Sequence, residues 1–307
     1  MLLLAACLVF AQDPPPLSIP DLLSRAAEEA EIFQQNAPKS LTQESLEQRT
    51  LVTATRFRPR IGKAPPSDPP KPHLIIREIV SEYSVGALKD SAEQNLIEFR
   101  QVITVDGRKV QKPEDARHAL SLGIKSPDDR VRKRMLENFA KHGLVDVATD
   151  YGLILLAFSK RAQQDMKFAL AGEEQVGADA AWVLAWRQTT SAGGILEFMG
   201  NQATRRALEG RLLVRKSDGL PLRIQAWNQH AQDGHVFRDD ATVDYTPSAH
   251  GFLTPASVVH RHSVDGQVIT ENLYRYEPFK MFSADTEIKF TELPDMPPPT
   301  APPPVKK

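Results

Sequence analysis

The chain has 307 residues, of which 41% are hydrophobic and 25% charged, and its formal net charge at pH 7 is −1. Those fractions are typical of globular proteins, and the length is sufficient for one large or two ordinary domains. Because the charge is balanced, the composition gives no bias toward nucleic acid or toward an anionic membrane surface. We therefore expect no nucleic-acid partner.

The first residues have the character of an export signal. A short apolar run ends at Ala11 and is followed by Gln12, Asp13 and three prolines. Small residues before such a break are typical of signal peptidase sites, so we predict a signal peptide at residues 1–11 and an exported protein, periplasmic or extracellular, of a bacterial envelope. The four residues that end at Cys7 also have the residue types of a lipid-attachment site, and an uncleaved end is a third reading. The run is shorter than the roughly 20 apolar residues that span a bilayer, so no transmembrane segment is expected after cleavage.

No sequence motif points to catalysis. Cys7 is the only cysteine, and cleavage after Ala11 would leave no disulfide, thiol nucleophile or Cys-ligated metal. The sequence has no nucleophile elbow, no HExxH, no P-loop and no GxGxxG pattern. We therefore predict a protein that is not an enzyme and that carries no cofactor.

Proline is concentrated in three blocks, at residues 14–20, 59–72 and 294–304. Such runs favour extended polyproline II structure and do not pack a core. The last block is either a solvated spacer or a ligand for an aromatic-lined groove. The blocks predict this organisation after the signal peptide: an N-terminal helical segment at 12–58, a linker at 59–72, an α+β domain at 73–293 and a disordered tail at 294–307.

Two helices are predicted in the N-terminal segment. Asp21 is a plausible N-cap, apolar residues recur at helical spacing from Leu22 to Phe33, and Pro38 ends this helix. Thr42 and the residues after it can start a second helix around Leu46. A helical pair placed before a linker is either a partner-docking element or an arm packed on the core.

The rest of the chain alternates between strand and helix signals. Strands are predicted at residues 74–83 and 96–105, the second followed by a tight Asp106-Gly107 turn. Helices are predicted at 113–163, including one that starts with Ser126 as N-cap and ends at Gly143, and a buried one at 150–158. Further strands are predicted at 180–188, 208–215, 222–229, 236–245, 257–264, 267–276 and 286–290.

This pattern predicts an α+β fold. Its main element is a curved antiparallel sheet, an open half-barrel-like meander, with packed helices and an N-terminal helical arm.

The C-terminal third resembles lipoprotein-sorting proteins of the LolA/LolB kind. One likeness lies in residues 212–224, which contain Gly219-Leu220-Pro221-Leu222 and are similar to a strand–turn–strand of that family. A second likeness is to the segments that follow it in that family, and it lies in residues 241–245, 251–255 and 274–279 with Phe282. Similar stretches occur in a related family of exported bacterial proteins. The resemblance implies an incomplete antiparallel barrel closed by helices, which holds acyl chains in an apolar hollow. The long N-terminal part and the helices at 113–163 depart from that pattern, so function has to be argued from a site.

Two neighbouring strands supply the candidate ligand-binding face. Leu222 and Ile224 alternate with polar residues in one strand, and Val243 and Tyr245 do so in the next. Side chains at alternate positions share a face of a sheet. This face has to be shielded from water. Helices either cover it completely or leave a hollow that a ligand occupies. We predict that Leu222, Ile224, Val243 and Tyr245 contact a lipid or another apolar molecule.

A hairpin near the C-terminus carries the weaker candidate. A two-residue turn at Asp265-Gly266 places His260 opposite Glu271 and His262 opposite Ile269. His260, His262 and Glu271 would then share a face, and two imidazoles with a carboxylate have the composition of a metal site. The alternative is a cross-strand His–Glu pair on a half-exposed sheet, and we expect no metal.

Three functions follow from these patterns. The favoured one is non-enzymatic binding of a lipid or other apolar ligand in the envelope. The second is an envelope protein-protein adaptor that uses the N-terminal helices and proline-rich segments. The third is a metal-dependent enzyme at the His260 hairpin.

Overall fold

The computed structural model describes residues 18–52, 71–87, 96–125, 137–144, 151–191, 195–199 and 202–282. Several expectations lie outside these residues: the signal peptide, the lipid-attachment site at Cys7, most of the proline blocks, the helix start at Ser126 and the strand at 286–290. Within the described residues no helix is long and apolar enough to cross a membrane.

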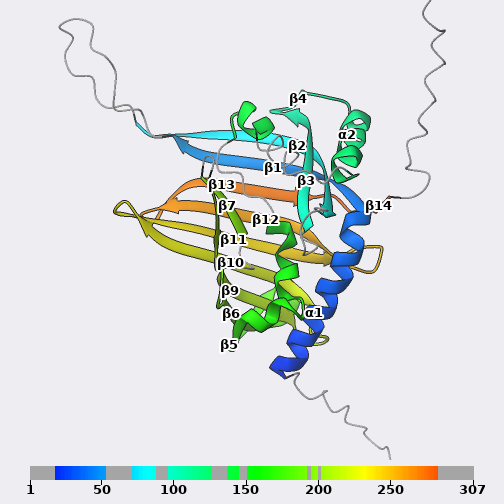
Figure 1. Ribbon diagram of the computed structural model, residues 1–307, viewed down its shortest axis with the longest axis vertical. Helices are drawn as coiled ribbons and strands as arrows, with labels where there is room; N and C mark the ends of the chain where they lie inside the picture. The colour runs from blue at the N-terminus through cyan, green and yellow to red at the C-terminus, as the bar shows by residue number, and fades with distance from the viewer. Residues whose placement is uncertain are drawn as a thin grey trace, which may run out of the picture.

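Among the described residues, one antiparallel sheet of 12 strands forms the body of the protein (Figure 1). The order does not close on itself, so the sheet is open and the predicted α+β fold is confirmed. Across the sheet the strands are β4 (Arg108–Lys109), β3 (Leu96–Val105), β2 (His73–Ala87), β1 (Ser40–Val52), β13 (Gln267–Tyr276), β12 (Leu253–Val264), β11 (His235–Pro247), β10 (Pro221–Gln232), β9 (Glu209–Arg215), β6 (Asp179–Gln188) and β5 (Met166–Val176), and β14 (Lys280–Met281) pairs with β1.

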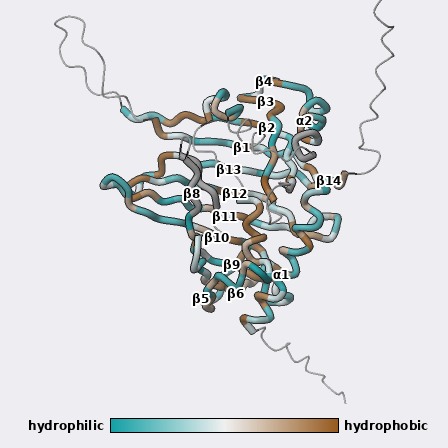
Figure 2. The backbone as a smooth tube through the Cα atoms, viewed as in Figure 1, coloured by the Kyte–Doolittle hydropathy of each residue, from teal (hydrophilic) through white to brown (hydrophobic). Residues whose placement is uncertain are grey.

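Helices lie over one face of this sheet, which we call the covered face. In Figure 1 helix α1 (Ile19–Asn36) and the 3₁₀ helix η2 (Tyr151–Phe158) cross in front of the strands, and α1 packs against η2 and β12. Figure 2 shows the apolar stretch of η2 lying across the sheet. The other described elements are α2 (Pro113–Lys125) on β2 and β3, the short 3₁₀ helices η1 (Ala37–Lys39) and η3 (Ala162–Asp165), and a separate hairpin of β7 (Ile195–Met199) and β8 (Gln202–Arg206).

The N-cap of helix α1 lies three residues before the predicted one. Ser18 is the N-cap: the backbone N–H of Asp21 donates to the Ser18 hydroxyl, and the Asp21 carboxylate accepts from the backbone N–H of Ser18 at 3.0 Å. Asp21 is therefore the third helical residue of a capping box, and its role as N-cap was wrong. Pro20 occupies the first turn, where a missing N–H costs nothing. The predicted apolar stripe is confirmed, since Leu22, Ala26, Ala30 and Phe33 are all buried.

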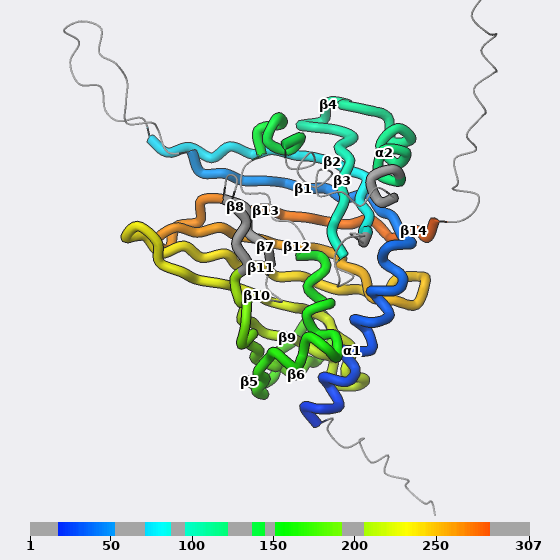
Figure 3. The backbone as a smooth tube through the Cα atoms, viewed as in Figure 1, coloured from blue at the N-terminus to red at the C-terminus, as the bar shows by residue number. Residues whose placement is uncertain are grey.

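The second predicted helix is wrong, because residues 40–52 form strand β1. This strand pairs with β2 on one side and with β13 on the other. Figure 3 shows the blue β1 beside the orange β13, so an early and a late segment of the sequence pair within one sheet. Tertiary pairing has overridden the helical spacing around Leu46. Residues 40–52 therefore lie within the sheet rather than in an arm before it.

Tight turns fix the register of the hairpins. Asp106-Gly107 and Asp265-Gly266 both have positive φ at the two central residues, at 47° and 73° and at 51° and 81°. This is the geometry of a type I′ turn, whose twist matches that of antiparallel strands. The predicted strands at 96–105 and 267–276 coincide with β3 and β13. The sequence reasoning missed β5, β7, β8 and the short β4 and β14.

Candidate functional site

An apolar row crosses eight strands of the covered face. Consecutive members of the row are Cα partners on neighbouring strands, and none is more than 2% exposed. From β2 to β6 the row consists of Ile79, Leu46, Tyr274, Val258, Val243, Ile224, Leu212 and Leu184. Such a continuous apolar surface requires cover from water.

Helix η2 supplies much of that cover. Its buried side chains include Leu155 and Phe158, both at 0% exposure, and they belong to the same core as the apolar row. The Phe158 ring lies 5.4 Å from that of Trp186, edge to face. The buried helix predicted at 150–158 is thus present, but as a 3₁₀ helix of eight residues. Runs of 3₁₀ helix beyond three or four residues are uncommon because their hydrogen bonds are poorly aligned.

Three of the four predicted ligand residues lie under this cover. Ile224 and Val243 belong to the apolar row, and Tyr245 lies in the same core. The Tyr245 hydroxyl accepts from the backbone N–H of Leu155 at 3.1 Å and donates to the carbonyl of Gly152 at 3.3 Å. Burial raises the pKa of Tyr245, so the phenol stays protonated and can make both bonds. Tyr245 therefore holds η2 on the sheet.

Leu222 does not join the other three. It packs with Ala181, Val183 and Leu213 in a separate small cluster. The cause is a register shift between Pro221 and Arg223, where β10 pairs with β9. A β-bulge re-aims a side chain at that point of a strand. The expectation that Leu222 and Ile224 share a face was wrong.

A buried ionic cluster anchors the N-terminal end of η2. The Arg100 guanidinium lies 2.7 Å from the Glu44 carboxylate and 2.8 Å from that of Glu98, and all three side chains are 1% exposed. Glu98 also accepts from the Tyr83 hydroxyl and from the backbone N–H of Gly152, both at 3.0 Å. Burial raises the pKa of Glu44. The sequence reasoning missed these residues, although Glu98 and Arg100 stand two apart in a predicted strand and so had to share a face.

The fit between η2 and this cluster leaves no space at Gly152. A methyl group there would lie 2.6 Å from the Glu98 carboxylate and 3.2 Å from the Tyr83 hydroxyl. The glycine thus permits the close approach that lets its backbone N–H reach Glu98.

The predicted cluster of His260, His262 and Glu271 is not formed. A bulge between His262 and Ser263 shifts the register, so that His260 faces Asn272 and Arg261 faces Glu271. Glu271 lies on the opposite face, 3.2 Å from Arg49 and 2.8 Å from Arg261. Among the described residues no group of three or more His, Cys, Asp and Glu side chains is placed to hold a metal ion.

The two histidines instead share one carboxylate on the covered face. Asp239 lies 3.3 Å from His260 and 2.9 Å from His262. Asn272 links His260 to Gln48, with contacts of 3.3 Å and 2.7 Å, and the Tyr151 ring of η2 lies 5.1 Å from the His260 ring. Burial alone would raise the pKa of Asp239, but the hydrogen bonds from both histidines outweigh it and hold the pKa well below its usual range.

Asp239→Asn should therefore change how stability depends on acidity. A carboxyl group whose folded-state pKa is depressed contributes stability above its unfolded pKa of about 3.9, and this contribution is lost as the pH falls toward the folded value. We expect the difference in free energy of unfolding between wild type and variant to be largest near neutral pH and to shrink below about pH 4. Urea unfolding across this range measures it, and a difference independent of pH would contradict the assignment.

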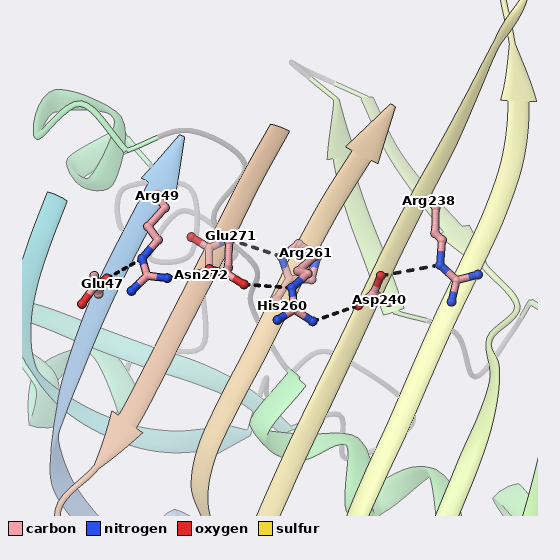
Figure 4. Close-up of polar contacts among 8 residues, drawn as sticks. All are labelled: Glu47, Arg49, Arg238, Asp240, His260, Arg261, Glu271 and Asn272. Atoms are coloured by element: carbon pink, nitrogen blue, oxygen red, sulfur yellow. Dashed lines mark hydrogen bonds and ion pairs between the residues drawn. The ribbon is translucent and has the colours of Figure 1, made fainter. Parts of the chain in front are cut away.

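Charged side chains alternate in sign on the opposite face, which we call the charged face (Figure 4). Arg49, Glu271, Arg261 and Asp240 are successive Cα partners on β1, β13, β12 and β11. The Arg261–Glu271 pair is the closest of the row at 2.8 Å, and Arg261 lies 4.0 Å from Asp240. Opposite charges on neighbouring strands stabilise a solvated face modestly.

Comparison with known proteins finds distant structural likenesses. No protein-family model matches the chain, and no curated protein matches it. Among the solved structures that resemble it are a LolA superfamily protein from Nitrosomonas europaea (12% identity, 87% of this chain and 94% of that chain, TM-score 0.29) and a DUF1329 family protein from Desulfovibrio piger (11% identity, 85% and 94%, TM-score 0.31). A third is the MucA/MucB complex from Pseudomonas aeruginosa (11% identity, 84% and 99%, TM-score 0.19). One of these structures is thus of the LolA type, the kind of protein that the C-terminal third resembles in sequence.

Proposed function

We propose that this protein binds an apolar ligand, such as an acyl chain, on the covered face, in the place that η2 fills in this structure. The observation that carries the proposal is the apolar row across eight strands, closed by a 3₁₀ helix. A helix with weak backbone hydrogen bonds is easier to displace than a regular α-helix. The apolar side chains of η2 exclude water from the apolar row until a ligand replaces them.

The exchange is energetically reasonable because apolar contacts are replaced by apolar contacts. Burying a methylene group stabilises by about 0.8 kcal/mol, so an acyl chain of about ten carbons recovers much of what η2 gives up. The polar bonds that hold η2 to the sheet include those made by Glu98 and Tyr245. The ligand therefore competes mainly with side chains of its own chemical kind.

The export leader supports the same role. An apolar molecule needs a protein carrier in an aqueous envelope compartment, and residues 1–11 have the character of a signal peptide. The adaptor alternative draws no support from α1, whose stripe is buried against η2 and the sheet rather than presented to a partner. The metal-dependent alternative loses its basis with the separation of Glu271 from the two histidines.

Quenching by a brominated fatty acid tests the proposal. Bromine quenches tryptophan only near contact, and Trp186 lies under η2 while Trp227 lies on the charged face beside Glu209. In full-length protein that keeps only Trp186 (Trp182→Phe, Trp227→Phe), we expect saturable quenching. In protein that keeps only Trp227, we expect none. Quenching of Trp227 alone, or of neither residue, would contradict binding at the covered face.

A further inference from the structure

The alternation of charge breaks at one end of the charged face. The row continues from Asp240 through Trp227, Glu209 and Arg187 to Lys167, on β10, β9, β6 and β5. Glu209 accepts from the indole N–H of Trp227 at 2.9 Å. Arg187 and Lys167 are direct Cα partners and both are exposed. Glu209 is the Cα partner of Arg187 on the other side, but no carboxylate of the described residues forms an ion pair with Arg187 or Lys167. Like charges directly opposite one another destabilise a sheet, so this end of the row lacks an anion.

A shallow hollow adjoins these two cations. Its volume is about 450 Å³. Small side chains of β5 and β6 make the space, namely Ala169, Ala171 and Ala185, and Trp227 forms part of its wall. The Arg211 side chain also lines it but is already paired with Glu174. The hollow therefore presents an apolar floor beside Lys167 and Arg187, which form no ion pair with a described carboxylate.

The strand that borders the hollow is the last of the sheet. Within the part of the chain that the structure describes, β5 pairs with β6 alone, and from Ala169 to Gln175 every residue is exposed, with Leu170 at 52%. The outer edge of such a strand carries backbone N–H and C=O groups that can pair with another chain. Two features restrict which chain can do so. Lys167 puts a charge on the edge, and the bulge between Leu170 and Gly172 limits the regular stretch to its first five residues.

We propose that β5 accepts an extended segment of a partner protein as an added strand. The segment carries an acidic side chain opposite Lys167 and, two residues along, a large apolar side chain over Ala169. The acid supplies the negative charge that the end of the row beyond Glu209 lacks. The apolar side chain occupies the hollow, because residues two apart on a strand share a face. Neutral and basic strands, which cannot neutralise Lys167 and Arg187, are rejected.

Peptide titrations test this surface. The probe is a fluorescent synthetic peptide, Thr-Val-Glu-Val-Phe-Val-Thr, and its counterpart has Lys in place of Glu. We expect the full-length protein to bind the acidic peptide and not the basic one. Lys167→Glu should weaken binding of the acidic peptide by about tenfold or more and strengthen binding of the basic one. Lys280→Glu makes the same charge change at an exposed position on β14, on the far side of the sheet, and should alter neither affinity.

Hydrogen exchange locates the peptide. Added-strand pairing should slow exchange of backbone amides within residues 166–170 and leave those of the β1–β2 hairpin unchanged. Equal affinity for both peptides, equal effects of the two Lys→Glu variants, or protection elsewhere than β5 would each overturn the proposal. These outcomes do not depend on the covered face, so they are separate from the test with brominated fatty acid.

Discussion

Arg100→Met is expected to lower the free energy of unfolding by about 3–5 kcal/mol, because it leaves two buried carboxylates without their cation. Glu44 and Glu98 are each 1% exposed, and Arg100 contacts both. Met keeps most of the apolar length of the side chain, so lost packing contributes little. The same replacement at Arg275, which is exposed on β13, should change stability by less than about 0.5 kcal/mol.

The pH dependence of this variant identifies the cause. Burial already raises the pKa of Glu44 in the native protein, and removal of Arg100 should raise it further. A carboxyl group with a raised folded-state pKa favours folding below its unfolded pKa of about 4.3, and this advantage is lost as the pH rises through the folded value. Arg100→Met should therefore regain part of its lost stability in mild acid. The triple variant with Glu44→Gln and Glu98→Gln should regain part of it at every pH. A loss that is independent of pH and is retained in the triple variant would point to packing instead.

The sequence predicted the C-terminal sheet well because its strands carry a simple signal. From Ile269 to Tyr274 the buried positions of β13 alternate with half-buried ones, and the tight turn at Asp265-Gly266 marks where the chain reverses. Strand β1 lacks such a hydrophobic pattern. Its buried positions include Glu44 and Gln48, which are satisfied by partners on β3 and β13. A pattern based on hydrophobicity cannot anticipate such partners, so the strand was taken for a helix.

The errors at the candidate sites share one physical cause. Both His260 with Glu271 and Leu222 with Ile224 were placed by unbroken alternation from a turn or along a strand. A bulge interrupts that alternation in each case. A single extra residue exchanges the two faces of everything beyond it, and no local residue pattern announced either bulge. Ile224 and Val243 are direct Cα partners, and they lie together with Tyr245 in one core.

Leu155→Ala should strengthen the binding of a fluorescent fatty acid by about 30-fold, if the ligand takes the place of η2. Leu155 is fully buried, and removing its side chain weakens the packing of η2 on the sheet by roughly 2 kcal/mol or more. When a protein must open before it binds, its apparent affinity is the intrinsic affinity multiplied by the fraction of molecules that are open. A variant that lowers the free energy of opening therefore improves the binding free energy by the same amount. Fluorescence titration of the full-length protein measures the change.

Leu213→Ala supplies the matched control for this gain. Leu213 is equally buried but lies in the separate cluster with Ala181, Val183 and Leu222, away from the core that η2 fills. The two variants should lose similar amounts of global stability, since each removes the same atoms from a buried site. Only Leu155→Ala should bind the probe more tightly, because only there does the lost contact belong to the element that must move. A similar gain in both variants would mean that general loosening admits the probe, and no gain in either would mean that η2 remains in place when the ligand binds.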